Sequence, residues 1–199
     1  KIIFLEKIFT KTRAYDLSKL ETVSNDSEIG GPLEIEDEES NVTNLIYDKS
    51  YRLELLRNIF LSVPLAAPME KYYVTSSYGF RKDPYTKRRA FHKGIDLGGA
   101  WGSNILATAS GKISFVGRYG SYGKSVFVDH GNGIETRYAH LSKIFVKEGE
   151  VVDLGKIIGK IGNTGRSTGK HLHYEIKVND KARNPKPFLK IGKNVFKKF

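Results

Sequence analysis

From residue 72 onward the sequence consists of short runs of alternating apolar and polar residues, which glycines separate at brief intervals. Such runs indicate β-strands, because successive side chains of a strand point to opposite faces of a sheet. The pairs Asn-Gly at 132–133 and Asn-Asp at 179–180 are typical of tight turns between antiparallel strands. The pattern therefore predicts a mainly β fold, a compact antiparallel domain that needs no long helix after residue 70. The expected strands span residues 73–76, 105–109, 111–116, 125–129, 135–140, 155–161 and 171–178.

The first 62 residues have a different character. Apolar residues at helical spacing predict an amphipathic helix over residues 1–20 and a second helix over 49–61, which Pro64 ends. Residues 21–50 are rich in acidic residues and contain Gly-Gly-Pro, a composition typical of a linker. We interpret this linker as a solvated tether. The alternative is an autoinhibitory or docking segment that binds the basic part of the chain in cis.

The predicted organisation has three parts. Residues 1–62 form the helical and acidic linker segment, residues 63–190 the β domain, and residues 191–199 a basic C-terminal tail. The charges follow this division: residues 1–62 hold 8 Lys or Arg against 12 Asp or Glu, and residues 63–199 hold 25 against 10. A net charge of +15 over residues 63–199 favours an anionic partner, whether a nucleic acid, a lipid surface or a carboxylate-rich polymer.

Two absences limit the chemistry of the chain. The sequence contains no cysteine, so disulfides, thiolate zinc sites and cysteine nucleophiles are excluded, and any metal must be held by histidine and carboxylate. No uncharged apolar run is long enough to span a bilayer. Because the sequence begins at Lys1 and not at a methionine, we leave room for an export signal, a membrane anchor or a coiled coil upstream of it.

Four of the five histidines stand in patterns that suit metal chemistry. His92 and Asp96 are separated by three residues, and Gly94 between them lets the backbone fold so that the two side chains converge. Imidazole and carboxylate together suit a borderline cation such as zinc. A surface histidine near an exposed aspartate is the alternative explanation of this pattern taken alone.

His171 and His173 lie two residues apart in a run that we expect to be a strand. Their side chains then share one face of the sheet, where two imidazoles can serve one site as ligand and as neighbouring acid or base. A pair of exposed surface histidines is the competing explanation. His140 ends another expected strand, a position where histidine is commonly structural or solvated. His130 precedes a turn, so we expect it to make turn hydrogen bonds and assign it no catalytic role.

In combination these patterns resemble the catalytic domain of the lysostaphin/LytM-type zinc endopeptidases, which are peptidoglycan hydrolases. The resemblance covers residues 75–178, and the order and spacing of its motifs agree throughout. The matching stretches are SYGFR at 77–81, HKGIDL at 92–97, HGNG at 130–133, YAHLS at 138–142 and STGKHLHYE at 167–175. The resemblance implies a barrel-sandwich-like antiparallel β fold with a groove over the metal.

The resemblance also implies roles for single residues. His92, Asp96 and His173 would be the ligands of Zn²⁺, and His140 and His171 the catalytic pair beside it. Three protein ligands leave a fourth position for water, as in catalytic zinc sites. The two remaining histidines could then take the proton of the water, stabilise the oxyanion and protonate the leaving amine. Which of them does which is not readable from the sequence.

We therefore expect a zinc metallo-endopeptidase that hydrolyses amide bonds in peptidoglycan cross-link peptides. The alternative is a non-hydrolytic cell-wall binding or amidase-activating scaffold of the same fold, against which the complete set of histidines argues. Nucleic-acid binding is not expected, because the basic residues are scattered and not grouped with aromatic residues on one element. The expected location is the cell envelope, in the bacterial periplasm or, alternatively, secreted. The sequence does not indicate the oligomeric state.

Overall fold

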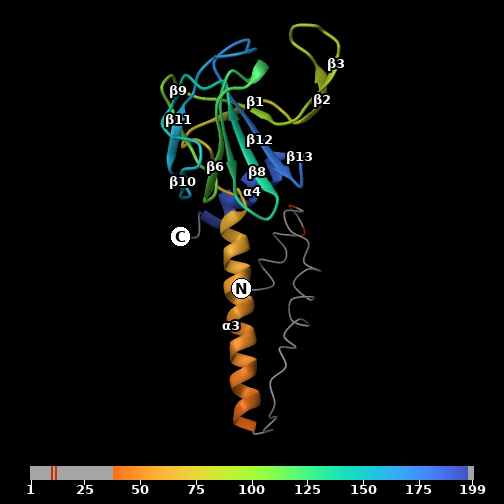
Figure 1. Cartoon of the computed structure of the whole chain (residues 1–199). Helices are drawn as coiled ribbons and strands as arrows, with labels where there is room; N and C mark the ends of the chain where they lie inside the picture. Colours follow the sequence, from red (N-terminus) through yellow and green to blue (C-terminus); the bar gives the residue numbers. More distant parts are fainter. Residues whose placement is uncertain (1–9, 11, 13–37, 197–199) are drawn as a thin grey trace. The chain divides into compact units, whose positions relative to one another are not determined.

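The structure is a computed structural model that describes residues 10, 12 and 38–196 (Figure 1). The chain divides into two compact units, residues 1–61 and residues 62–199. The helix expected over residues 1–20 lies outside the described residues, apart from Thr10 and Thr12.

In the first unit, residues 38–61 belong to one helix, α3 (Glu38–Ser62), whose last residue, Ser62, is the first residue of the second unit. The prediction of a helix over 49–61 is confirmed, but the prediction of a linker as far as residue 50 is wrong from residue 38 onward. The physical reason is that glycine and proline are absent between residues 38 and 62, so nothing in the sequence interrupts the helix. Among the described residues, no helix is long and apolar enough to cross a membrane.

The second unit is built on a large antiparallel sheet (Figure 1). Its strands lie side by side in an order that brings distant parts of the sequence together, with β13 pairing only with β12. In spatial order they are β1 (Tyr73–Ser76), β4 (Ile95–Gly98), β12 (Leu172–Val178), β8 (Ile134–Ala139), β7 (Lys124–Asp129), β6 (Gly111–Arg118) and β10 (Val151–Val152), and β13 is Lys181–Arg183. This arrangement confirms the predicted antiparallel β domain.

Two smaller sheets complete the domain. One contains β5 (Asn104–Leu106), β11 (Ile157–Lys160) and β9 (Lys143–Ile144). The other is the hairpin of β2 (Gly79–Lys82) and β3 (Arg89–His92), which stands apart from the main sheet in Figure 1. A short 3₁₀ helix, η1 (Gly120–Tyr122), joins β6 to β7.

A second helix, α4 (Pro185–Phe196), lies near the C-terminal end of the domain. It contradicts the expectation that no long helix follows residue 70, and the predicted domain boundary at residue 191 falls inside it. The physical reason is its amphipathic spacing: Phe188, Leu189 and Val195 are buried, while the lysines of the helix are exposed. Pro185 fits the first turn of a helix, where its missing N–H costs nothing.

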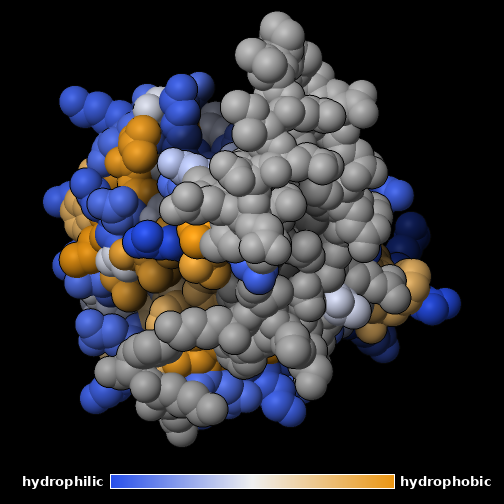
Figure 2. Space-filling model, turned by 90° about the horizontal axis from the view of Figure 1, so that it is seen from below, coloured by the Kyte–Doolittle hydropathy of each residue, from blue (hydrophilic) through white to orange (hydrophobic). Residues whose placement is uncertain are grey.

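The core of the domain combines apolar side chains with a buried group of hydroxyls. The hydroxyls of Tyr138 and Tyr174 each lie 2.9 Å from Oγ1 of Thr108, so both buried rings have polar partners. The largest fully buried apolar side chains are Met69, Leu97, Ile105, Ile113, Ile134, Leu141 and Phe188. On the face shown in Figure 2, hydrophilic residues dominate the edge of the coloured surface and hydrophobic residues form smaller patches between them.

Candidate active site

Three strands bring His92, Asp96 and His173 together. His92 ends β3, Asp96 lies in β4, and His173 lies in β12 directly opposite Asp96 in the β4–β12 pair. Gly94 in the turn between β3 and β4 packs against the Tyr174 carbonyl oxygen so closely that a Cβ atom would collide with it. The glycine is therefore needed because β12 lies so close to it. The sequence had indicated only that a glycine lets the backbone fold at this point.

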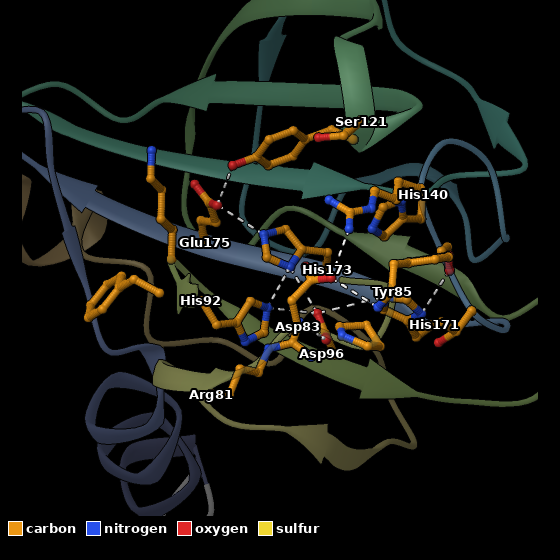
Figure 3. Close-up of a pocket in the computed structure, with 17 residues that line it drawn as sticks. Arg81, Asp83, Tyr85, His92, Asp96, Ser121, His140, His171, His173 and Glu175 are labelled. Atoms are coloured by element: carbon orange, nitrogen blue, oxygen red, sulfur yellow. Dashed lines mark hydrogen bonds and ion pairs between the residues drawn. The ribbon is translucent and has the colours of Figure 1, made fainter. Parts of the chain in front are cut away.

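The polar atoms of these three side chains converge on one point (Figure 3). Nε2 of His92 lies 3.1 Å from Oδ1 of Asp96 and 3.0 Å from Nδ1 of His173. Nδ1 of His173 lies 2.8 Å from the same Asp96 oxygen. All three side chains are buried, with 7% exposure each. A buried triangle of two imidazoles and one carboxylate is a group that could hold a metal ion.

Hydrogen bonds on the far sides of the two imidazoles orient them for this purpose. Nδ1 of His92 donates to the carbonyl oxygen of Ser77 at 2.8 Å, and Nε2 of His173 donates to Oε1 of Glu175 at 2.9 Å. In the neutral rings, the nitrogens that face Asp96 therefore hold lone pairs. Three acceptor atoms about 3 Å apart repel one another unless a positive charge lies between them. Two imidazoles and one carboxylate are ligands that zinc accepts, so the residues fit this metal.

The pKa values also show that the site favours a cation. Burial acts to lower the pKa of His173, but the hydrogen bonds with Asp96 and Glu175 outweigh it and raise that pKa to about 9. Burial acts to raise the pKa of Asp96, but the hydrogen bonds with His173 and His92 hold it well below its usual range. The second oxygen of Asp96, Oδ2, lies 3.3 Å from a guanidinium nitrogen of Arg81, which leaves Oδ1 to face the histidines.

His140 and His171 lie beside the triangle, with their ring centroids 4.8 Å apart. Both are held by the loop between β11 and β12: Nδ1 of His140 donates to the carbonyl oxygen of Thr164, and Nδ1 of His171 to that of Gly169, each at 2.7 Å. The Nε2 atoms are thereby left without a proton in the neutral rings. Nε2 of His171 lies 3.6 Å from Oδ1 of Asp96.

His140 has an unusual backbone and a shifted pKa. Its φ angle is +62°, in the left-handed region that residues other than glycine seldom adopt, and its N–H donates to the carbonyl oxygen of Tyr122. Such conformations concentrate at functional sites, where the surrounding structure holds them in place. Burial lowers the pKa of His140 to about 4, so the ring is a neutral base at pH 7.

All five residues line one pocket of about 260 Å³ (Figure 3). Arg81, Asp83, Tyr85 and Phe91 of the β2–β3 hairpin lie on its wall, together with Arg166 and Ser167 of the loop before β12. Arg166 links the two walls, because its guanidinium lies 2.8 Å from Oδ1 of Asp83.

Comparisons with known proteins agree with this site. The profile of peptidase family M23 matches residues 90–185. The catalytic domain of the antimicrobial peptidase lysostaphin from Staphylococcus simulans is 34% identical with a TM-score of 0.55, and the match covers 60% of this chain and 92% of that domain. The chain belongs to peptidase family M23. A zinc-containing peptidase from Vibrio cholerae is 38% identical with a TM-score of 0.54, over 59% of this chain and 37% of that one.

Curated M23 relatives include two bacterial enzymes. The DD-carboxypeptidase/endopeptidase Mpg of Neisseria meningitidis is 44% identical over 118 residues, which are 59% of this chain and 27% of Mpg. The peptidoglycan DD-endopeptidase ShyA of Vibrio cholerae is 38% identical over 139 residues, which are 69% of this chain and 31% of ShyA. The chain thus spans less than a third of the length of these two relatives.

The structure of this M23 domain adds residues that the sequence analysis missed. Glu175 follows His173 by two residues in the same strand, so the period of two could have placed both on one face. The carbonyl groups of Thr164 and Gly169 have no signal in the sequence, because every residue has one. His130 lies away from the site: its N–H donates to the Ile134 carbonyl oxygen across the turn, as expected, and its buried ring contacts the Ser110 carbonyl oxygen and the Thr136 hydroxyl.

Proposed function

We propose that this M23 domain is a zinc-dependent DD-endopeptidase that hydrolyses amide bonds in peptidoglycan cross-link peptides. The observation that supports the proposal most directly is the convergence of His92 Nε2, Asp96 Oδ1 and His173 Nδ1 within about 3 Å of one another, with His140 and His171 beside them. We assign the first three residues as ligands of Zn²⁺ and the last two as catalytic residues.

Zinc held by these three residues would polarise the scissile carbonyl and lower the pKa of the attacking water. The residues of this chain orient the metal ligands and transfer the protons. Ser77 and Glu175 fix which ring nitrogens face the metal, and Arg81 orients the Asp96 carboxylate. Because these partners are in place in the folded chain, little reorganisation accompanies the reaction.

His140 and His171 supply proton transfer in this proposal. Their Nδ1 atoms are occupied by the carbonyl groups of Thr164 and Gly169, so their Nε2 atoms accept a proton from the attacking water. The low pKa of His140 keeps it neutral and ready to accept at pH 7. The protonated ring can then donate to the leaving amine nitrogen. Its partner can hydrogen-bond the oxyanion when its own Nε2 carries a proton.

The relatives and the charge support the proposed substrate and location. ShyA is named as a peptidoglycan DD-endopeptidase, and Mpg as a DD-carboxypeptidase and endopeptidase. A domain with a net charge of +15 attracts a polymer rich in carboxylates. We therefore place the protein in the cell envelope and, more specifically, in the bacterial periplasm, with secretion as the alternative. A non-hydrolytic scaffold is disfavoured because the ligand and acid-base sets are both complete.

The decisive experiment is digestion of purified cell walls by the protein loaded with zinc. Walls with D-alanyl–diaminopimelate bridges and walls with glycine bridges are incubated separately, and the released fragments are identified by mass. We expect cleavage of the first type and loss of cleavage after treatment with a chelator, with recovery on adding zinc. Release of fragments by metal-free protein, or failure of zinc-loaded protein to cut either wall, would overturn the proposal.

A further inference from the structure

The β2–β3 hairpin presents two faces with different chemistry. Its register pairs Gly79 with His92, Phe80 with Phe91, Arg81 with Ala90 and Lys82 with Arg89. His92 and Arg81 point toward Asp96. Because side chains alternate along a strand, Phe80, Lys82, Arg89 and Phe91 belong to the opposite face. We call these four residues the outer face of the hairpin.

The aromatic residues of the outer face are exposed and ordered by contacts with one another. Cζ of Arg89 lies 4.2 Å from the centre of the Phe80 ring, and the rings of Phe80 and Phe91 meet edge to face with centroids 5.0 Å apart. The ring of Tyr78 packs against Phe91 in the same way at 5.1 Å. Phe80 is nevertheless 67% exposed and Phe91 44% exposed. Two adjacent phenylalanines at the surface add little to the stability of the fold, because water still covers them.

The charge of the hairpin is strongly positive. Residues 79–92 contain five lysines and arginines and one acidic residue, Asp83. Asp83 is engaged by Arg166 from another loop, and Arg81 is engaged by Asp96. Within the part of the chain that the structure describes, the other four cations of the hairpin have no acidic partner. The hairpin therefore lacks a counter-charge that an anionic ligand could provide.

The outer face is also continuous with the active-site pocket. Phe91 lines that pocket and precedes His92 directly in β3. A second hollow on the hairpin is lined by Phe80, Arg81, Lys82, Lys87 and Arg89. A long ligand with one segment in the pocket can therefore extend over Phe91 onto the outer face without leaving the surface of the domain.

We propose that the outer face of the hairpin is a second binding surface for the peptidoglycan polymer, separate from the site of hydrolysis. In this arrangement Phe80 and Phe91 stack on the apolar faces of sugar rings, and Arg89 and Lys82 contact carboxylates of the attached peptides. The inference rests on the proposed function, because it takes the substrate of the pocket to be part of that polymer. It adds that binding to the polymer depends on Phe80 and Arg89, which do not line the pocket where the peptide is cut.

The test compares a polymer with a small substrate. The double variant Phe80→Ala/Arg89→Ala is assayed, in the full chain loaded with zinc, for sedimentation with insoluble walls, for wall hydrolysis, and for hydrolysis of a short soluble cross-linked peptide. Loss of ring stacking and one cation should weaken wall binding by about tenfold, a change of about 1.4 kcal/mol. Wall hydrolysis should fall with it, while cleavage of the short peptide and zinc content stay within about twofold of the original values.

A matched control exists at Lys143 in β9 and at Phe145, which directly follows β9. Lys143 Nζ lies 5.3 Å from the centre of the Phe145 ring, and Phe145 is 43% exposed, so this pair has the same chemistry away from the hairpin. Lys143→Ala/Phe145→Ala should bind walls normally. The single variant Phe80→Tyr keeps an aromatic ring and should therefore keep most of the wall binding. Unfolding curves of all variants identify any that fail to fold.

Several outcomes would overturn the inference. Undiminished wall binding by the double variant Phe80→Ala/Arg89→Ala would overturn it. An equal loss of wall binding in the control variant Lys143→Ala/Phe145→Ala would overturn it too. An equal loss on walls and on the short peptide would mean that the hairpin acts through the metal site. A loss of DNA binding with wall binding intact would assign the surface to nucleic acid. If the unaltered protein sediments with walls and cuts nothing, the proposed function fails but the binding surface stands.

Discussion

Glu175 accepts a hydrogen bond from Nε2 of His173 at 2.9 Å, and this bond decides that Nδ1 of His173 faces Asp96. Glu175 is 1% exposed, and the hydroxyl of Tyr122 donates to the same oxygen at 2.7 Å. Burial acts to raise the pKa of Glu175, but the hydrogen bond with His173 outweighs it, so the carboxylate stays ionised. Glu175 thus holds a negative charge behind the imidazole and makes it a better metal ligand.

Replacing Glu175 by alanine should weaken zinc binding by about 10- to 100-fold, because His173 loses the partner that sets its orientation. Zinc affinity is measured by competition with a coloured chelator, independently of any activity. Tyr122→Phe is the matched control: it removes one donor to Glu175 and leaves the bond to His173, so its effect should be smaller. A folded Glu175→Ala protein with unchanged zinc affinity would contradict the assigned role.

The three proposed ligands should behave as a group. His92→Ala and Asp96→Ala each remove one of the three converging atoms, so zinc content and wall hydrolysis should be lost together. Metal analysis of the purified variants, done beside a hydrolysis assay, provides the measurement. Retention of one zinc per chain by the Asp96 variant would mean that the metal is held elsewhere.

His140→Ala and His171→Ala should separate metal binding from catalysis. Neither ring takes part in the triangle, so zinc content should be retained, while hydrolysis should fall by about 100-fold or more, as for loss of a general base. If either variant is purified without metal, a ligand and a catalytic residue have been exchanged in our assignment.

The sequence predicted the members of this site better than the way in which they meet. His92, Asp96, His140, His171 and His173 could be selected because their motifs are short and ordered. Strand β4, which places Asp96 opposite His173, was not expected: it has four residues, all buried, and therefore lacks the alternation by which strands are recognised. The loop carbonyl groups that orient His140 and His171 could not be predicted from the sequence either, because every residue has a carbonyl group whatever its side chain.

A further prediction concerns stability in acid. Burial lowers the pKa of His130 to about 4, against an ordinary value near 6.5. Between these values the unfolded chain binds a proton at His130 and the folded chain does not, so the free energy of unfolding falls as pH drops from 6.5 to 4. The contribution is fully present above pH 6.5 and amounts to roughly 3 kcal/mol.

The variant His130→Gln cannot titrate in this range. It should be less stable than the original protein at pH 7.5, because hydrogen bonds to Ser110 and Thr136 are disturbed, but it should lose less stability on acidification. Denaturant unfolding at pH 7.5, 5.5 and 4.5 measures both effects. His140 also has a lowered pKa, and since it is present in both proteins, the difference between their slopes reports on His130. Parallel slopes would show that His130 does not contribute.

The last prediction concerns the acidic segment before residue 62. Its net charge of −4 is opposite to the +15 of the second unit, which permits an attraction that salt screens beyond roughly 8 to 10 Å. A shorter chain that begins at Ser62 keeps the whole second unit, including the buried Val63 and Leu65. If the segment inhibits in cis, the shorter chain should cut walls faster than the full chain, and the difference should shrink as salt is raised. Equal rates at every salt concentration would instead identify a tether, and slower cutting by the shorter chain would mean that the segment supports the catalytic domain.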